Sequence, residues 1–385
     1  MNLLQVVQTA SSPLTCVRRC RSLRIGVPWG RKTRQRVIVL AAALCAFLIL
    51  VSVKGGPVIL LRHVNTLEQR VNRAVSTPLG MDKTSRRLVD LDTVHVAIFA
   101  DEKLFPGVVT LTNSIVSNTA SPVTFHFVTF PSNATRLRLW ITGSKLRNIT
   151  FEIVEFPVSI LNGKYRCSSS RKELSNPLNF ARFYLQTLFP KVGKIIYMDC
   201  DCLVLGNIKE LYNIQLDSHH PVSLLRMCDL EEDFFSDIKN LLNFSNPDVI
   251  KASISSDACI LNNGVFVADL IAWDQLNISQ QLEYWMTLNT RSAIFRAGDV
   301  GSGSQAPMNM VFHNRNTPLP PEWNMLSGTY KNKKLNLTAK LIHWNGQRKP
   351  WMSCQSPLWN QYSVPDPCGR VQWCVKGVSH RPGSS

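Results

Sequence analysis

The stretch KIIYMDCDCLVL, Lys194–Leu205, places two carboxylates between two apolar runs. A short apolar segment flanked by glycines predicts one buried strand of a parallel sheet that is covered on both faces. Because side chains alternate along a strand, we expect Asp199 and Asp201 on one side and Cys200 on the other. Two carboxylates this close repel each other unless a cation lies between them, and oxygen ligands suit Mn²⁺ or Mg²⁺. A solvated turn that carries two aspartates by chance is the alternative interpretation.

The composition is that of a folded protein with a sizeable core. The chain has 385 residues, of which 45% are hydrophobic, enough for one large domain or two. Its formal net charge is +17, and much of this excess lies in the first 36 residues, which contain no acidic residue. No basic motif with interleaved aromatic residues is present, so the sequence does not indicate nucleic acid as a partner.

An uncharged run, VIVLAAALCAFLILVSV at Val37–Val53, follows this basic segment. As a helix it would be about 26 Å long, which spans a thin bilayer. The run is too far from the N-terminus for an ordinary signal peptide, so we predict a signal anchor. The positive-inside rule then leaves the basic tail in the cytoplasm and the rest in the lumen, as a single-pass type II protein of the Golgi or ER membrane. A buried core helix is the alternative.

Two further patterns agree with a lumenal body. Five Asn-X-Ser/Thr sequences predict N-glycosylation, at Asn133, Asn148, Asn243, Asn277 and Asn336. Eight cysteines follow the predicted anchor, namely Cys167, Cys200, Cys202, Cys228, Cys259, Cys354, Cys368 and Cys374. In an oxidising compartment some of them should form disulfides, although sequence leaves their connectivity open. A zinc site is disfavoured because the chain has no CxxC pair.

The remaining chain divides into a stem at 54–93, a globular domain at 94–369 and a C-terminal tail at 370–385. Within the domain we expect strands at 94–100, 123–130 and 149–156 that alternate with helices at 104–118, 134–144 and 177–188. This alternation predicts βαβ units and a mostly parallel sheet. Ligands of such sheets bind beyond the carboxyl ends of the strands, where Asp101 and the Asp-Cys-Asp triplet both fall. Because no glycine-rich phosphate loop is present, a metal ion is the expected phosphate holder.

Three later segments carry polar residues next to apolar ones. Asn262-Asn263-Gly264 predicts a turn that enters a buried strand, and 273–288 predicts an amphipathic helix. His343 ends an apolar run and opens the segment HWNGQRKPW. On local evidence it is either a hydrogen-bonded histidine at a strand end or a third metal ligand.

Together the Asp-Cys-Asp triplet, NFARFY, Asn-Asn-Gly, HWNGQRKPW and VPDP resemble the family 8 glycosyltransferases, especially the animal glycosyltransferase 8 domain-containing proteins. The resemblance covers 94–369. It implies an α/β fold of the GT-A type, the nucleotide-diphospho-sugar transferase fold with a Rossmann-like, mostly parallel sheet, behind the transmembrane anchor.

The resemblance also implies roles for individual residues. Asp199, Asp201 and His343 would hold Mn²⁺, with Mg²⁺ as the alternative. The donor would be contacted by Phe99, Ala100 and Asp101 around uridine, by Arg182, by Gly346 and Lys349 at the diphosphate, and by Asn263 and Gly264 at the sugar. The residues implied in catalysis are Gln305, Asn262 and Arg182.

The implied reaction transfers a sugar from a UDP-sugar to a hydroxyl of a glycan, protein or lipid, with retention of configuration. One position departs from the family, because Ser304 stands where many members have an acid next to the glutamine that is Gln305 here. A catalytically weak or inactive protein that binds glycans or nucleotides on the same fold is therefore the alternative function. A haloacid dehalogenase-like phosphatase is disfavoured, since Leu203 stands where that motif needs Thr or Val. A homodimer stays open.

Overall fold

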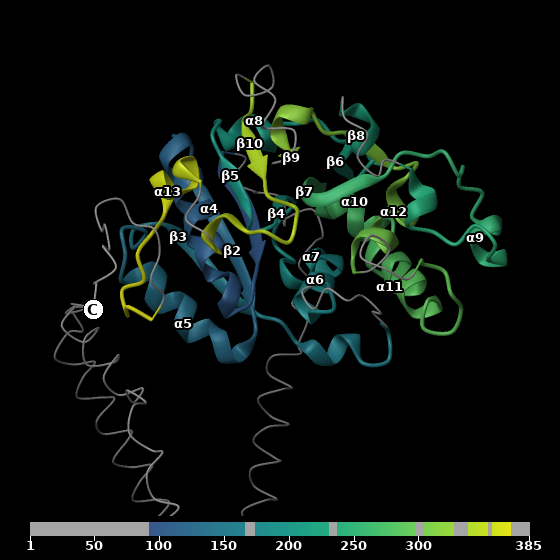
Figure 1. The fold of residues 1–385 in the computed structure, drawn as a ribbon, viewed down its shortest axis with the longest axis horizontal. Helices are drawn as coiled ribbons and strands as arrows, with labels where there is room; N and C mark the ends of the chain where they lie inside the picture. The colour runs from purple at the N-terminus through teal and green to yellow at the C-terminus, as the bar shows by residue number, and fades with distance from the viewer. Residues whose placement is uncertain are drawn as a thin grey trace, which may run out of the picture. The chain divides into compact units, whose positions relative to one another are not determined.

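The computed structural model describes residues 92–165, 174–230, 237–296, 303–326, 338–352 and 356–370. Its centre is a seven-stranded sheet of order β3-β2-β1-β4-β7-β6-β8 (Figure 1). The strands are β1 (Val94–Phe99), β2 (Val123–Thr129), β3 (Thr150–Glu155), β4 (Lys194–Met198), β6 (Val222–Arg226), β7 (Leu261–Asp269) and β8 (Asn316–Pro318). The first four are parallel neighbours, whereas β7 is antiparallel to both β4 and β6. This is a GT-A-like α/β arrangement with a mostly parallel sheet.

Helices cover both faces of the sheet. They are α4 (Phe105–Asn118), α5 (Pro131–Thr142), α6 (Pro177–Ala181), α7 (Leu185–Leu188), α8 (Ile208–Tyr212), α9 (Pro247–Lys251), α10 (Leu270–Gln275), α11 (Ile278–Leu288), α12 (Gln305–Phe312) and α13 (Pro357–Tyr362). Alternation along β1 sends Val96 and Ile98 into the core under α4 and α5, and Ala97 and Phe99 into the core with α6, α7, α10 and α11. The predicted double coverage is therefore confirmed.

The expected single strand through Asp-Cys-Asp is wrong, because the chain changes sheets there. β4 ends at Met198, and Cys202 opens β5 (Cys202–Val204), which belongs to a second sheet with β9 (Met325–Leu326) and β10 (Leu341–His343). The Asp199 N–H donates to the carbonyl of Gly264 at 2.7 Å, and Cys202 N–H turns back to the Asp199 carbonyl at 3.2 Å. The triplet is thus a turn between two sheets, and it points its carboxylates into the space between them.

Two predicted helices are interrupted. The one expected at 177–188 is α6 and α7 joined by a 3₁₀ turn, Arg182–Tyr184. The one expected at 273–288 breaks between α10 and α11 at Asn277, whose φ of 52° is left-handed. Asparagine tolerates this conformation better than most residues, so periodicity alone does not reveal the break.

Asn262-Asn263-Gly264 lies inside β7 rather than in a turn before it. The pairing of β6 with β7 is regular on either side but shifts between Leu224, which faces Phe266, and Leu225, which faces Asn262. The residues between those two partners therefore form a bulge in β7, and the bulge borders the end of β4. Bulges of this kind re-aim side chains next to functional sites.

A disulfide joins Cys228, just after β6, to Cys259, just before β7. The expectation that some of the cysteines pair is thus confirmed. Cys200 and Cys202 are buried free thiols, and burial raises the pKa of both well above the ordinary value. The cross-link holds the two strands together beside the bulge.

Four of the five predicted glycosylation sites fall in the part of the chain that the structure describes. Asn148 and Asn277 are exposed, whereas Asn133 and Asn243 are half-buried. The amide of Asn243 donates to the carbonyl of Ala293 at 2.9 Å. Asn336, the basic tail, the predicted anchor and nearly all of the stem lie outside the described residues. In the described ranges, no helix has both the length and the apolar character to cross a membrane.

Three titratable side chains are linked across β1, β2 and β3. His126 is 3% exposed, and its two ring nitrogens lie 2.6 Å from a Glu152 carboxylate oxygen and 2.8 Å from His95 Nδ1. Burial lowers the pKa of His126, and this effect outweighs the opposite effect of Glu152. The folded protein therefore favours the neutral form of this histidine.

This environment makes stability depend on pH in a stated direction. A histidine whose pKa is lower in the folded state makes its full contribution to the free energy of unfolding above its unfolded pKa of about 6.5. This contribution decreases as the pH falls below that value. We expect the free energy of unfolding in urea to fall between about pH 7.5 and pH 5.5, with His126 contributing to that fall. His126→Gln should flatten the dependence. An unchanged pH profile in the variant would contradict the assignment.

Candidate functional site

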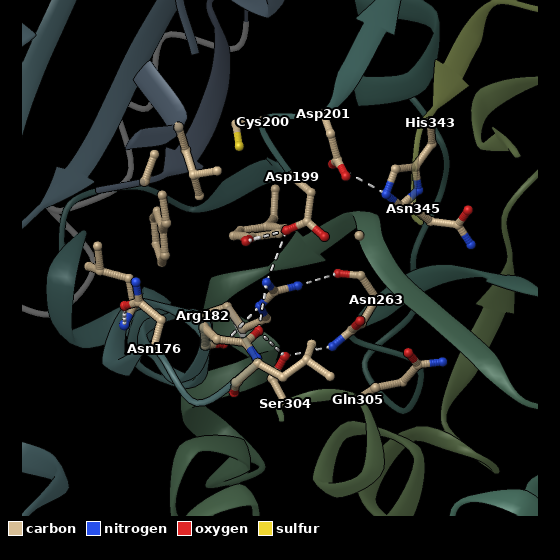
Figure 2. Close-up of a pocket in the computed structure, with 18 of the residues that line it drawn as sticks. Asn176, Arg182, Asp199, Cys200, Asp201, Asn263, Ser304, Gln305, His343 and Asn345 are labelled. Carbon is tan, nitrogen blue, oxygen red and sulfur yellow. Dashed lines mark hydrogen bonds and ion pairs between the residues drawn. The ribbon is translucent and has the colours of Figure 1, made fainter. Parts of the chain in front are cut away.

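A cavity of about 450 Å³ lies where β1 and β4 end (Figure 2). This is the edge of an open α/β sheet at which ligands bind. The bulge of β7, the start of α12 and the turn after β10 complete its wall. The predicted site residues that line it are Phe99, Ala100, Asp101, Arg182, Asp199, Asp201, Asn262, Asn263, Gly264, Gln305, His343 and Lys349. Gly346 is not part of the lining, whereas its neighbour Asn345 is.

The wall beyond β1 is built by Phe99 and Asp101. The Phe99 ring packs edge-on against Tyr197, with centroids 5.2 Å apart. One oxygen of Asp101 accepts the Lys103 backbone N–H at 3.1 Å, and the other accepts the Asn176 amide at 2.8 Å. Sequence reasoning missed Asn176, which precedes the apolar start of α6 and reads locally as a helix cap.

Arg182 lines the cavity, and its guanidinium donates hydrogen bonds to other groups of the protein. Its guanidinium donates to the Asn263 carbonyl at 2.7 Å, to Asp199 Oδ1 at 2.9 Å and to Asn179 Oδ1 at 3.2 Å. It also lies over the Tyr197 ring, 4.4 Å from the centroid. Burial is the largest single effect and lowers the pKa of Arg182, but the neighbouring groups, Asp199 foremost, together outweigh burial and raise it. The residue therefore stays charged and fixes Asp199 relative to β7.

The two aspartates of the turn have different partners. Asp199 Oδ1 accepts from Arg182 and from the Tyr197 hydroxyl at 2.8 Å. Asp201 Oδ2 forms an ion pair with Lys349, whose ammonium also donates to the Trp344 carbonyl. Burial is the largest single effect and would raise the pKa of Asp201, but Lys349 and His343 together outweigh it and hold that pKa well below the ordinary value. Each aspartate thus lies beside one cation.

Asp199 and His343 both approach Gly264, the residue of the β7 bulge that has no side chain. A Cβ on Gly264 would lie 2.9 Å from both Asp199 Oδ2 and His343 Nε2, and 2.3 Å from His343 Cε1. His343 Nε2 is also 3.4 Å from Asp201 Oδ1. The absence of a side chain at Gly264 therefore leaves the space between Asp199 and His343, and Asp201 approaches the same imidazole nitrogen.

The donor set in this space fits a divalent cation. Asp201 Oδ1 is buried and has no hydrogen-bond partner in the part of the chain that the structure describes, an arrangement that is costly unless something positive reaches it. Carboxylate oxygens and an imidazole nitrogen are ligands that Mn²⁺ accepts, and carboxylates suit Mg²⁺. Asp201, His343 and the Cys202 thiol form a tighter group, with their ligand atoms within 4.8 Å of one another. Sequence reasoning missed Cys202, which pairs with His343 across β5 and β10.

The wall of the cavity that carries Ser304 and Gln305 is neutral. Ser304 is 2% exposed, and its hydroxyl accepts from the Asn263 amide at 2.9 Å and donates to Asn179 Oδ1 at 2.8 Å. The Ser304 hydroxyl is therefore already engaged with two amides. The Gln305 side chain lines the cavity next to it (Figure 2).

Asn324 is a further buried residue of the site that sequence reasoning missed. It is fully buried, and its Oδ1 lies 2.9 Å from His343 Nδ1. Its amide donates to Asn262 Oδ1 at 3.1 Å. In the sequence it follows Trp323 in a proline-rich segment, and no local pattern distinguishes it from a turn residue.

The sequence matches the family model described as "Glycosyl transferase family 8" over residues 95–355. It is 39% identical to the human glycosyltransferase 8 domain-containing protein 2 over 275 residues, 67% of this chain and 78% of that protein. It is 34% identical to the mouse glycosyltransferase 8 domain-containing protein 1 over 295 residues, 72% of this chain and 79% of that protein.

Solved structures agree in fold at much lower identity. A galactosyltransferase, LgtC, crystallised with donor and acceptor sugar analogues, matches with a TM-score of 0.53 and 15% identity, over 70% of this chain and 94% of that one. The bifunctional glycosyltransferase WbbM matches with a TM-score of 0.52 and 18% identity, over 71% of this chain and 49% of that one. With the family model covering most of the globular domain, the chain belongs to glycosyl transferase family 8.

Proposed function

We propose that this protein transfers a sugar from a UDP-sugar to an acceptor hydroxyl of a glycan, protein or lipid, with retention of configuration and with the assistance of Mn²⁺. The observation that carries the proposal is that Asp199 approaches His343 across Gly264 and Asp201 approaches the same imidazole, while Asp201 Oδ1 has no hydrogen-bond partner among the described residues. This convergence lies at the ligand-binding edge of a family 8 glycosyltransferase.

The metal would be held by Asp199 Oδ2, Asp201 Oδ1 and His343 Nε2. When bound there, Mn²⁺ acts as a Lewis acid that offsets the charge developing on the departing diphosphate. Cys202 is the nearest competing ligand, but burial raises the pKa of its thiol well above the ordinary value, so it stays protonated and unsuited to a hard cation.

Lys349 has two uses in this scheme. When no divalent cation is bound, the Lys349 ammonium neutralises the charge of Asp201. With a divalent cation on Asp201 Oδ1, that balance no longer depends on Lys349, whose ammonium can then reach a phosphate oxygen. A fixed positive charge beside the leaving group stabilises the transition state more than the bound donor, because charge grows there as the bond breaks.

The remaining walls suit the other parts of the donor. Phe99, Ala100 and Asp101 offer an aromatic edge, a small residue and an oriented carboxylate, which suit a base and a ribose. On the sugar side the side chains are amides and a hydroxyl, from Asn262, Asn263, Ser304 and Gln305, and among the described residues that line it none is a carboxylate. This supports attack by the acceptor on the face that the diphosphate leaves, without a covalent intermediate on a protein carboxylate.

A second candidate function is nucleotide-sugar or glycan binding without turnover. Ser304 favours it, because a hydroxyl engaged with Asn263 and Asn179 cannot stabilise positive charge at the reacting sugar carbon as a carboxylate would. The two candidates share the metal and nucleotide sites and differ only in the transfer step.

We also propose that the protein is anchored in the Golgi or ER membrane through Val37–Val53 with its globular domain in the lumen. The uncharged run and its basic flank support this topology. The Cys228–Cys259 disulfide supports an oxidising compartment.

The first prediction concerns the donor. The full chain, incubated with Mn²⁺ and UDP-glucose, UDP-galactose, UDP-xylose, UDP-glucuronic acid or the UDP-N-acetylhexosamines, should release UDP from one of them. Asp199→Asn and Asp201→Asn should abolish that release, since each removes a ligand charge. Asp366→Asn is the matched control, because it breaks the buried ion pair with Arg136 outside the cavity. Binding of UDP without turnover of any donor would favour the second candidate.

The second prediction concerns Lys349. Lys349→Met should lower UDP release by about 10²-fold or more at saturating donor, as expected for the loss of a preorganised charge at the leaving group. Lys340→Met removes a lysine that pairs with Glu210 on the surface and should leave the rate unchanged. Equal rates for Lys349→Met and the unmodified protein would exclude a role in the transfer step.

The third prediction concerns Gly264. A methyl group there would occupy the space between Asp199 and His343, so Gly264→Ala should lower Mn²⁺ affinity at least about tenfold by calorimetry. Gly346→Ala is the control for metal binding, since a Cβ at that position meets no atom within 4 Å. Wild-type Mn²⁺ affinity in Gly264→Ala would show that the cation binds elsewhere.

A further inference from the structure

A continuous run of hydrogen bonds lies behind His343. The Gly264 backbone N–H donates to Asn262 Oδ1 at 3.0 Å, and Asn324 Nδ2 donates to the same oxygen at 3.1 Å. Asn324 Oδ1 then lies 2.9 Å from His343 Nδ1. All of these side chains are buried, Asn324 at 0% and His343 at 2% exposure. The run therefore joins the β7 bulge to the end of β10.

The backbone N–H at one end sets the direction of every bond in this run. Because a backbone N–H can only donate, the atom of Asn262 that faces it must be the carbonyl oxygen. Asn324 therefore turns its NH₂ group to that oxygen and its own carbonyl oxygen to His343. An amide oxygen only accepts, so the proton must be on Nδ1 of His343.

The protonation state of the other ring nitrogen, Nε2, is then determined as well. A neutral imidazole that carries its proton on Nδ1 has a free lone pair on Nε2. In this structure Nε2 faces Asp201 Oδ1 across 3.4 Å, and no described residue forms a hydrogen bond with that oxygen. Two acceptors that face each other in a buried space repel unless a cation lies near both.

A doubly protonated His343 fits the geometry less well. It would donate from Nε2 to Asp201, and such charge-assisted bonds are usually about 2.7–2.9 Å long. The observed 3.4 Å lies beyond that range and beyond the ordinary range for N–H···O bonds of about 2.7–3.2 Å.

We propose that Asn324 is a positioning residue for the metal site, and that together with Asn262 it holds His343 in the tautomer whose Nε2 can bind a divalent cation. The inference rests on the proposed function, since it concerns the same cation. Asparagine suits the position because it supplies both an acceptor to His343 and a donor to Asn262. Aspartate supplies only the acceptor, and leucine supplies neither.

The first experiment measures the tautomer directly. The metal-free full chain, labelled with ¹⁵N-histidine, is studied by NMR at about pH 8, above the ordinary histidine pKa, and His343 is assigned by the signals lost in His343→Gln. The expected spectrum has a protonated Nδ1 and an unprotonated Nε2 for His343. A protonated Nε2 would overturn the proposal. This result does not depend on the folding of any Asn324 variant.

The second experiment measures Mn²⁺ affinity by calorimetry on the full chain. Asn324→Leu removes the acceptor and should weaken binding about 10–100-fold, the usual effect of losing the group that orients a ligating histidine. Asn324→Asp keeps the acceptor and should bind Mn²⁺ more tightly than Asn324→Leu and retain the Nδ1-protonated tautomer. Asn246→Leu removes a buried asparagine that caps α9 away from the cavity, and should bind Mn²⁺ as the wild type does.

The outcomes separate this inference from the proposed function. If the wild type binds no Mn²⁺, the metal-assisted transferase is wrong, and the NMR spectrum still decides the role of Asn324. If Asn324→Leu is folded by circular dichroism and binds Mn²⁺ as tightly as the wild type, the positioning role is wrong. If Asn324→Leu does not fold, the wild-type tautomer and the affinity of Asn324→Asp decide the question.

Discussion

The hydrogen bond from the Asp199 N–H to the Gly264 carbonyl, 2.7 Å long, is the contact on which the site depends. It is made where β4 leaves the large sheet and where β7 bulges away from β6. Each irregularity alone would leave backbone groups without partners, and together they satisfy each other. Because this bond sets the distance between the Asp-Cys-Asp turn and Gly264, it also decides how closely the carboxylates approach His343, which enters from the second sheet.

Charge balance explains why this turn can bury Asp201 and hold the half-buried Asp199 close to it. A buried carboxylate without a counter-charge is destabilising by several kcal/mol. Here Arg182 stands beside Asp199 and Lys349 beside Asp201, so the site is neutralised before any ligand enters. The two cations differ in what else they bind. Arg182 is anchored to Asn263 and Asn179, whereas the one further hydrogen bond of the Lys349 ammonium within the described residues goes to the Trp344 carbonyl, so fewer protein groups hold Lys349.

The layer structure was predictable because it follows from local patterns. The alternation of strands and helices from Val94 to β4 depends on hydrophobic periodicity, and the structure confirms it with small shifts at the element ends. The breaks were not predictable in the same way. A strand that changes sheets at Asp199 and a helix interrupted at Asn277 keep their apolar spacing, and the interruptions depend on partners distant in sequence.

The sequence by itself determined the residue types that could form a site. Asp199, Asp201 and His343 were recognisable from their motifs, and the structure places all three in the lining of one cavity. Only the tertiary structure decided what each one contacts. No sequence pattern singled out Asn324, because its partners are distant in the chain. They are His343, 19 residues later, and the Asn262 side chain, 62 residues earlier. Side-chain identity is local information, but hydrogen-bond direction depends on how three separate segments pack, and no sequence pattern encodes it.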